Sequence, residues 1–442
     1  MTEISIAYRN SKLILPKDSQ ELIINKRKGI DCVSVVIKSK SGLSHIIKKY
    51  NSRIKVISFS AIKNLSNQYI LYFKKIGIKA IAKICYDYYH SGLVDFCIPN
   101  VKYKIQQASL ERNDNLYNQQ WFFKNTGQFN GIPGEDIKLE AAMEYLALNN
   151  INISNNINIA ILDDGIDPSH EDIDNTRIIA KFDLLDSDNN PTPSGALTHG
   201  TYIAGVIAAI INNSIGIAGI NPSTNLIIGR ISGNHLDSST AALGIQKAVE
   251  FGARIINLSW GIEFPNPQIS EAIEEAYSNN VLIIAASGNY FQSNNTKVLF
   301  PGTMDKVLTV GACDQKGKWI NLRSVPPNGN QKFGSRYGRH VDLVAPGMQI
   351  PTTNYNIPAL PFIPTYNYFN GTSAATAIVS GIASLILSIK PSLSNEELKS
   401  ILLSSTDDIS INHSPAEAIG YDHIGHGRIN ALKAIKMVAQ GI

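Results

Sequence analysis

The sequence predicts an α/β protein with a doubly wound, mostly parallel sheet, preceded by a small α+β domain. Two observations support this prediction. From residue 137 onward, short apolar runs alternate with helical stretches, as a parallel sheet covered by helices requires. Within residues 1–100 the apolar pattern instead follows the order βαββαβ, which is typical of a ferredoxin-like module. A polar connector, residues 101–136, separates the two parts.

The small domain is predicted from apolar periodicity. Apolar residues alternate along its strands and recur at helical spacing along its second helix. The predicted elements are strands at Val33–Ile37, Lys55–Phe59, Gln68–Phe73 and Leu93–Ile98, and helices at Leu43–Asn51 and Ile78–Tyr89.

The large domain, residues 137–442, is predicted from buried apolar runs, which are typical of parallel strands. Its predicted strands are Ile157–Leu162, Asn225–Arg230, Ile255–Leu258, Val281–Ala285, Val307–Ala312 and Val341–Val344. Its predicted helices are Tyr202–Ile211, Ser239–Phe251, Gln268–Asn279 and Ala374–Ile389. The carboxyl ends of such strands meet at one edge, where these sheets bind ligands.

Polar residues stand at the ends of several predicted elements. Asp163 closes a buried strand, and His199 and Ser373 each precede a helix. A serine hydroxyl becomes a good nucleophile when a histidine accepts its proton and a carboxylate orients that histidine. Asn289 ends another strand, where its amide can donate to an oxyanion together with the backbone N–H of Ser373.

The motifs that contain these residues resemble those of the subtilases, the subtilisin-like serine peptidases. The matching segments are ILDDGIDPSHEDI, THGTYIAGVIAAIINNSIGIAGINP, IINLSWG, IIAASGN, VDLVAPG, FNGTSAATA and GHGRIN, in that order. The resemblance implies an endopeptidase with Ser373 as nucleophile, His199 as general base, Asp163 as orienting carboxylate and Asn289 in the oxyanion hole. The alternative is a catalytically silent relative that binds peptides or regulates.

Local features also resemble the kexin and furin branch of the family. Asp164 stands where many members have Ser or Thr, which implies contact with a basic residue of the substrate; the alternative is a solvated loop carboxylate. An extended substrate is expected to add as a strand along Ser259, Trp260 and Gly261, and Gly288 is also expected to contact the substrate.

The resemblance further implies a structural calcium ion. The loop INNSIGI begins at Ile211 and ends at Ile217, and it matches the calcium loop of the family. Calcium prefers oxygen ligands, here carbonyl groups such as that of Ile215 together with the side chains of Asn213 and Asp172. No redox or organic cofactor is expected.

The tail of the small domain, SGLVDFCIPN, resembles the end of a subtilase propeptide, which implies an inhibitory N-terminal domain and a zymogen processed between Val101 and Asn118. Residues 1–110 contain 19 Lys and Arg against 6 Asp and Glu, whereas the rest contains 21 against 30. Opposite charges favour docking of the two parts. The alternative, nucleic-acid binding by clusters such as Lys26-Arg27-Lys28, has no accompanying motif.

Composition adds expectations about location. The first residues show no charged-then-apolar leader with a small-residue cleavage site, and no apolar run is judged long enough for a membrane span. The four cysteines form no metal-ligand cluster and no disulfide framework, which favours a reducing compartment. A cytoplasmic protein is therefore expected, with secretion by another route as the alternative.

Overall fold

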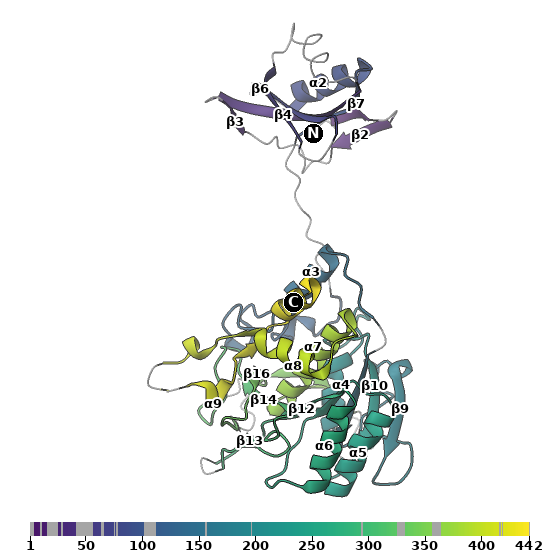
Figure 1. Ribbon diagram of the computed structural model, residues 1–442, viewed down its shortest axis with the longest axis vertical. Helices are drawn as coiled ribbons and strands as arrows, with labels where there is room; N and C mark the ends of the chain where they lie inside the picture. The colour runs from purple at the N-terminus through teal and green to yellow at the C-terminus, as the bar shows by residue number, and fades with distance from the viewer. Residues whose placement is uncertain are drawn as a thin grey trace. The chain divides into compact units, whose positions relative to one another are not determined.

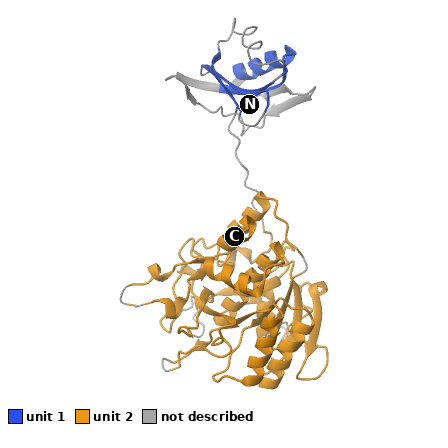
Figure 2. Ribbon diagram, viewed as in Figure 1, with its two compact units in different colours: residues 1–107 blue, residues 108–442 orange. Residues whose placement is uncertain are grey.

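The computed structural model describes residues 4–8, 11–15, 25–27, 30–40, 56–62, 66–74, 76, 78–100, 112–154, 157–195, 197–292, 295–324, 332–355, 364–414, 417 and 419–441. The chain separates into two compact units, Met1–Gln107 and Ala108–Ile442 (Figure 2).

The first unit contains an antiparallel sheet. Its strands are β3 (Asn25–Arg27), β4 (Ile30–Ser39), β5 (Val56–Ala61), β6 (Gln68–Lys74) and β7 (Val94–Pro99). β4 pairs with β6 and β7, and β5 pairs with β6, so the order β7-β4-β6-β5 agrees with the predicted ferredoxin-like module. A further hairpin joins β1 (Ile4–Tyr8) to β2 (Ser11–Leu15).

One helix, α2 (Ile78–His90), closes the core of this sheet. Its buried residues Ile81, Ile84 and Cys85 pack with Val35 and Leu71 of the strands, as the helical spacing predicts. The predicted helix Leu43–Asn51 lies outside the described residues.

The second unit is built on a nine-stranded sheet, shown in Figure 1, in the order β19-β20-β16-β14-β12-β11-β8-β10-β9. All neighbours from β9 to β20 are parallel, and β19 is antiparallel to β20. The strands are β8 (Asn158–Asp163), β9 (Ile178–Asp183), β10 (Asn225–Arg230), β11 (Ile255–Leu258), β12 (Leu282–Ala286), β14 (Val307–Cys313), β16 (Leu343–Pro346), β19 (Thr406–Asp407) and β20 (Arg428–Ile429). This is the predicted doubly wound sheet.

Helices cover both faces of the sheet because side chains alternate along each strand. Ile159 and Ile161 of β8 belong to one core, and Ala160 and Leu162 belong to the other. The first core is closed by α3 (Leu139–Leu148), α4 (His199–Ala208), α7 (Thr372–Ile389), α8 (Asn395–Ser404) and α10 (Ala431–Gln440); the second is closed by α5 (Ser238–Glu250) and α6 (Pro267–Ser278).

Short elements complete the unit: β13 (Asn289–Tyr290) pairs with β15 (Gly334–Ser335), β17 (Ile350–Thr353) pairs with β18 (Tyr366–Phe369), and α9 is Tyr421–Ile424. Several predicted boundaries differ from the observed ones. The predicted helix Tyr202–Ile211 corresponds to α4, which ends at Ala208 because Ala209 takes φ −52° and ψ 145°. The chain then enters the loop that begins at Ile211.

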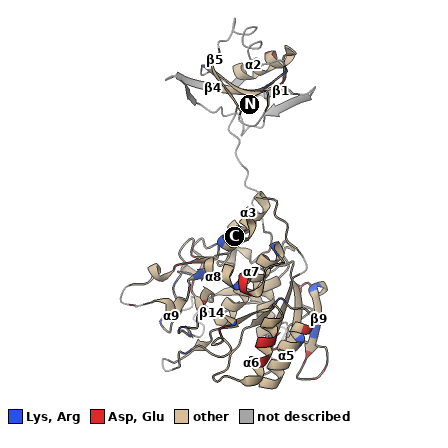
Figure 3. Ribbon diagram, in the orientation of Figure 1, with Lys and Arg blue, Asp and Glu red and all other residues tan. Residues whose placement is uncertain are grey.

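Charge in the second unit is distributed over helices as well as loops. On α6, Glu271, Glu274 and Glu275 are acidic, and Figure 3 shows red segments of the ribbon at this helix. The net negative charge expected from composition is therefore spread beyond the carboxyl edge of the sheet.

Helix α7 is the longest of the described helices, and it is strongly apolar. Its 18 residues have a mean hydropathy of 1.8, which meets the length and composition of a membrane span, contrary to the sequence-based judgement that no run does so. However, 94% of the helix is buried inside the unit, as in the central helix of a packed core.

Candidate active site

The four predicted catalytic residues lie at element ends in the second unit. Asp163 is the last residue of β8, and His199 is the first residue of α4. Ser373 is the second residue of α7, and Asn289 begins β13, three residues after β12. Because β8 and β12 are parallel strands of one sheet, their carboxyl ends share an edge.

Asp163 and His199 are directly hydrogen-bonded. His199 Nδ1 lies 2.8 Å from Asp163 Oδ1, which also accepts the Asp164 N–H at 2.8 Å. A carboxylate at Nδ1 selects the tautomer with the proton on that nitrogen and leaves Nε2 to accept a proton. The His199 ring meets Phe369 edge to face at 5.3 Å, which fixes the ring plane.

The charge state of His199 reflects opposing influences. Burial lowers the pKa of His199, but the charge and hydrogen bond of Asp163 and the charge of Asp164 outweigh it and raise the pKa to about 9. The side chain is 36% exposed, so a substrate can reach its outer nitrogen.

Asp164 is buried beside the start of α4. It is only 5% exposed, so it is not a solvated loop carboxylate. Its Oδ2 accepts the His199 N–H at 3.0 Å and its Oδ1 accepts the Gly200 N–H at 2.7 Å. Burial, then the charge of Asp163, raise the pKa of Asp164 to about 6. Asp164 therefore caps the N-terminus of α4, which starts with His199.

Ser373 is buried and bonded to the segment that precedes Trp260. Its Oγ donates to the Ser259 carbonyl at 2.8 Å, and the Ser259 hydroxyl donates to the Ser373 carbonyl at 3.2 Å. Since a hydroxyl has one proton, the Ser373 proton must turn from Ser259 toward His199 before transfer. This pair of bonds ties the nucleophile candidate to the predicted substrate strand.

Asn289 lies beside the start of α7. Its Oδ1 accepts the Thr372 N–H at 3.0 Å and the Thr372 hydroxyl at 3.1 Å, which orients the amide Nδ2 away from Thr372. The Ser373 N–H belongs to the first turn, where backbone donors have no partner within the helix. A Cβ added to Gly371 would lie 3.1 Å from Asn289 Nδ2 and 3.7 Å from Ser373 N. The missing side chain of Gly371 thus leaves a space bordered by two donors.

The other predicted substrate contacts adjoin this region. The Trp260 indole donates to the Leu162 carbonyl at 2.9 Å, so its ring is fixed beside the end of β8. Gly261 and Gly288 both border the side chain of Leu299, which sequence reasoning did not identify.

The predicted calcium residues gather around one buried carboxylate. Asp172 Oδ1 accepts from Asn213 Nδ2 at 2.8 Å, and its Oδ2 accepts the Ile217 N–H at 2.9 Å. The carbonyl groups of Ile211, Ile215 and Ile217 accept no backbone hydrogen bond within the described residues. Burial raises the pKa of Asp172 to about 7 although these two hydrogen bonds lower it.

Asp114 is a further member of this cluster that the sequence did not reveal. It is buried, its Oδ1 accepts the Asn213 N–H at 3.2 Å, and its Oδ2 has no hydrogen-bond partner in the described part of the chain. Its charge contributes to the raised pKa of Asp172. The described residues contain no cluster of three His, Cys, Asp or Glu side chains, so any cation here would depend on carbonyl and amide oxygens.

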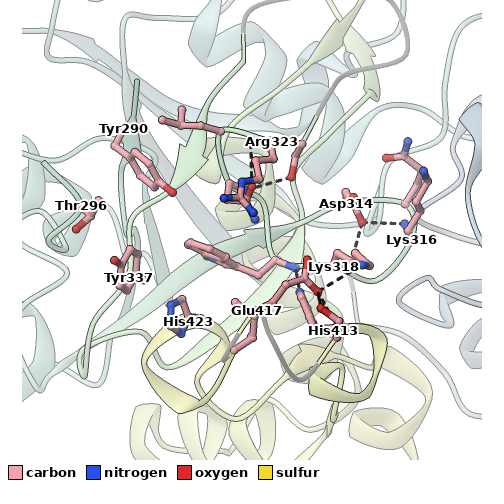
Figure 4. Close-up of a pocket in the computed structure, with 17 residues that line it drawn as sticks. Tyr290, Thr296, Asp314, Lys316, Lys318, Arg323, Tyr337, His413, Glu417 and His423 are labelled. Atoms are coloured by element: carbon pink, nitrogen blue, oxygen red, sulfur yellow. Dashed lines mark hydrogen bonds and ion pairs between the residues drawn. The ribbon is translucent and has the colours of Figure 1, made fainter. Parts of the chain in front are cut away.

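A large cavity lies elsewhere and does not mark the catalytic residues. Its volume is about 1040 Å³, and its lining includes the aromatic cluster of Trp319, Tyr337 and His423 (Figure 4). The ion pair between Lys318 and Glu417, at 3.6 Å, also lies there. None of Asp163, His199 or Ser373 lines this cavity, so size alone does not locate the reactive groups.

Comparison with known proteins assigns the second unit to a family. A family model described as the subtilase family matches residues 154–425. Thermitase of Thermoactinomyces vulgaris is 32% identical over 63% of this chain and 88% of thermitase. The cell wall-associated protease of Bacillus subtilis (strain 168) is 30% identical over 77% of this chain, but the match spans only 37% of that protein.

Two solved protease structures have a similar fold. A protease from Pseudoalteromonas arctica PAMC 21717 superimposes with a TM-score of 0.59 at 25% identity, covering 74% of this chain and 99% of that one. The Aeromonas sobria serine protease, solved in complex with a chaperone, gives a TM-score of 0.61 at 22% identity over 76% of this chain and 69% of that one, which shows a shared fold.

Proposed function

The chain belongs to the subtilase family of serine-type endopeptidases, and we propose that it hydrolyses peptide bonds with Ser373, His199 and Asp163. The observation that carries this proposal is the 2.8 Å contact between His199 Nδ1 and Asp163 Oδ1, which leaves Nε2 as the base. The role of Ser373 is supported by its hydrogen bond to Ser259, which directly follows β11, because β11 is parallel to β8 and Asp163 ends β8.

The proposed reaction has two acyl-transfer steps. Ser373 Oγ attacks the substrate carbonyl while His199 takes the Ser373 proton, and the imidazolium then protonates the departing amine as the C–N bond breaks. Water next attacks the acyl-enzyme with His199 as base, and Ser373 regains its proton as the acid product leaves. Asp163 stays ionised and stabilises the imidazolium, while the space beside Gly371 receives the oxyanion.

Asp164 is expected to contribute to the pH dependence of this reaction, after the larger effect of Asp163. Only neutral His199 accepts a proton, so kcat/KM should rise as pH rises through its pKa of about 9. Asp164→Asn removes a charge that raises this pKa, so the midpoint should move to lower pH. Loss of one cap acceptor should also cost about 0.5–2 kcal/mol of stability. Rate–pH profiles and denaturant unfolding measure both effects.

The control for this variant is Asp188→Asn, which removes an exposed carboxylate elsewhere in the unit. Its rate–pH profile should match that of the wild type. An unchanged midpoint in Asp164→Asn would mean that Asp164 does not act on the charge of His199. A library of substrates also tests the kexin-like hypothesis, under which Asp164 favours Lys or Arg next to the scissile residue.

We propose that the N-terminal unit is an inhibitory propeptide that the enzyme cuts away. The opposed charges of the two parts support docking, with 19 basic and 6 acidic residues in positions 1–110. The deciding experiment is the intact mass of purified wild type beside Ser373→Ala, with calcium present. A cut between Val101 and Asn118 in the wild type alone is expected; two full-length chains would contradict self-processing.

A calcium ion is proposed for the loop between Ile211 and Ile217. The residues present fit, since Asp172 and Asp114 are buried without a basic partner among their recorded contacts, and Asp114 Oδ2 is unpaired in the described part of the chain. Asp172, Asp114, Asn213 and the loop carbonyls would hold the ion, which when bound would cross-link the loop to the segment around Asp114.

Calcium removal is therefore expected to lower thermal stability. An ion at 100 times its Kd stabilises a protein by about 2.7 kcal/mol, so a chelator should lower the Tm of the Ser373→Ala protein by several degrees. Asp172→Asn should abolish most of this calcium-dependent shift, whereas Glu271→Gln on α6 should keep it. Calorimetric titration with calcium gives an independent readout. An equal shift in all three proteins would exclude this loop as the site.

A further inference from the structure

Leu299 lies between two segments that border the start of α7, the one that contains Gly261 and the one that contains Gly288. The Leu299 N–H donates to the Ser287 carbonyl at 3.0 Å. Its neighbour Phe300 exchanges two backbone hydrogen bonds with Ile262, at 2.7 and 3.0 Å. The backbone of Leu299 is thus held on both sides, and the position of its Cβ is fixed with it.

The side chain of Leu299 occupies the space that two glycines leave open. A Cβ added to Gly261 would lie 2.6 Å from the Cβ of Leu299, and one added to Gly288 would lie 2.6 Å from its Cδ1. Both distances are far below van der Waals contact. The isobutyl group therefore packs against both glycine backbones and fills the gap between them.

This gap is where the residue that supplies the attacked carbonyl must place its side chain. Gly288 precedes the oxyanion donor Asn289, and Gly261 follows Ser259 and Trp260, of which Ser259 is bonded to Ser373. A carbonyl carbon at Ser373 Oγ, with its oxygen toward Asn289, brings its own residue between these two backbone segments. Glycines at both positions admit the substrate backbone, and Leu299 limits the depth available beyond it.

We propose that Leu299 restricts cleavage to bonds that follow small residues, such as Ala, Gly or Ser. This inference rests on the proposed peptidase function of Ser373. Leu299 is partly exposed, as a side chain at the floor of an open subsite should be. Because its Cβ is fixed by the backbone, rotation of the side chain cannot clear the gap beside Gly261.

The surrounding charge also disfavours a basic residue at this subsite. A Cβ on Gly288 would lie 2.9 Å from Cδ of Arg336, whose side chain is buried. The Arg336 guanidinium donates to the Asn289 carbonyl at 3.1 Å and to Glu263 at 2.8 Å. Glu263 is therefore already paired with Arg336, and these contacts include no other carboxylate that could bind a substrate Lys or Arg.

The test is a series of peptide substrates that differ only in the residue before the scissile bond: Ala, Leu, Phe and Arg. Wild-type kcat/KM for Ala is expected to exceed that for Phe and Arg by at least about tenfold, the usual scale of discrimination by pocket size. Equal or better cleavage after Phe or Arg would overturn the proposal.

Leu299→Ala should deepen the subsite. The ratio of kcat/KM for Phe to that for Ala is expected to rise at least about tenfold over the wild-type ratio. Leu243→Ala, which shortens an exposed leucine on α5, should leave the ratio unchanged. An unchanged ratio in folded Leu299→Ala would contradict the role of Leu299, and Leu299→Val provides a smaller change if the alanine variant does not fold.

Labelling of the active serine by a fluorophosphonate separates this inference from the proposed function. Labelled enzyme that cleaves after Phe as well as after Ala refutes the subsite proposal only. Protein freed of its N-terminal unit that is folded, unlabelled and inactive on every peptide refutes the peptidase function itself.

Discussion

Ser373→Ala is expected to lower kcat by about 10⁶-fold, the scale seen when a serine peptidase loses its nucleophile. The reason is that the proposed acyl-enzyme forms on Ser373 Oγ, which the variant lacks. Residual hydrolysis, about 10³- to 10⁴-fold above the uncatalysed rate, should remain because the oxyanion donors and the binding surface are intact. Turnover of a fluorogenic peptide by processed enzyme measures the loss.

Structure should survive this substitution. Ser373 lies in the first turn of α7, and alanine is the best helix former, although the bond from Ser373 Oγ to the Ser259 carbonyl is lost. Circular dichroism and the Tm serve as controls. His199→Ala should cost a similar factor, and the double variant should cost little more than either alone, because the two groups act as a unit. If the losses of kcat from Ser373→Ala and His199→Ala were additive in the double variant, Ser373 and His199 would not act as a unit.

The sheet and its long helices could be predicted because their signals are local. β10 and β11 have the predicted bounds, Asn225–Arg230 and Ile255–Leu258, since each is a short Ile- and Leu-rich segment, and short length with β-branched residues favours a strand. The edge strand β9 was not predicted: its residues, IIAKFD, contain only a short apolar run, and four of the six are partly or fully exposed. The segment becomes a strand because it pairs with β10 in the folded sheet.

The sequence predicts which residues belong to the site, but it does not predict which of their atoms are in contact. Motifs identify Asp163 and His199. Only the folded chain shows that both carboxylate oxygens of Asp164 accept backbone N–H groups from the first turn of α4. Asp114 and Leu299 have no local signal at all. Asp114 lies 58 residues before its partner Asp172, and Leu299 meets Gly261 from a separate segment, so both depend on the fold.

Asn289→Ala is expected to reduce kcat by about 10²- to 10³-fold, or about 2.7–4 kcal/mol of transition-state stabilisation, with little change in KM. The amide Nδ2 borders the space beside Gly371, and a donor there is worth most when negative charge develops on the substrate oxygen. Steady-state kinetics on a peptide with alanine before the scissile bond measure both constants.

A second variant distinguishes this role from a structural one. Asn289 also accepts hydrogen bonds from the Thr372 N–H and hydroxyl, so Asn289→Ala removes a support for the start of α7 as well as a donor. Asn289→Asp keeps an acceptor for Thr372 and adds a negative charge at a helix N-terminus, which stabilises the helix. It replaces the donor by an oxygen that repels an oxyanion. If Asn289 acts by donation, the aspartate variant should retain its Tm and lose at least as much activity as the alanine variant; recovery of activity by aspartate would mean that Asn289 only holds α7 in place.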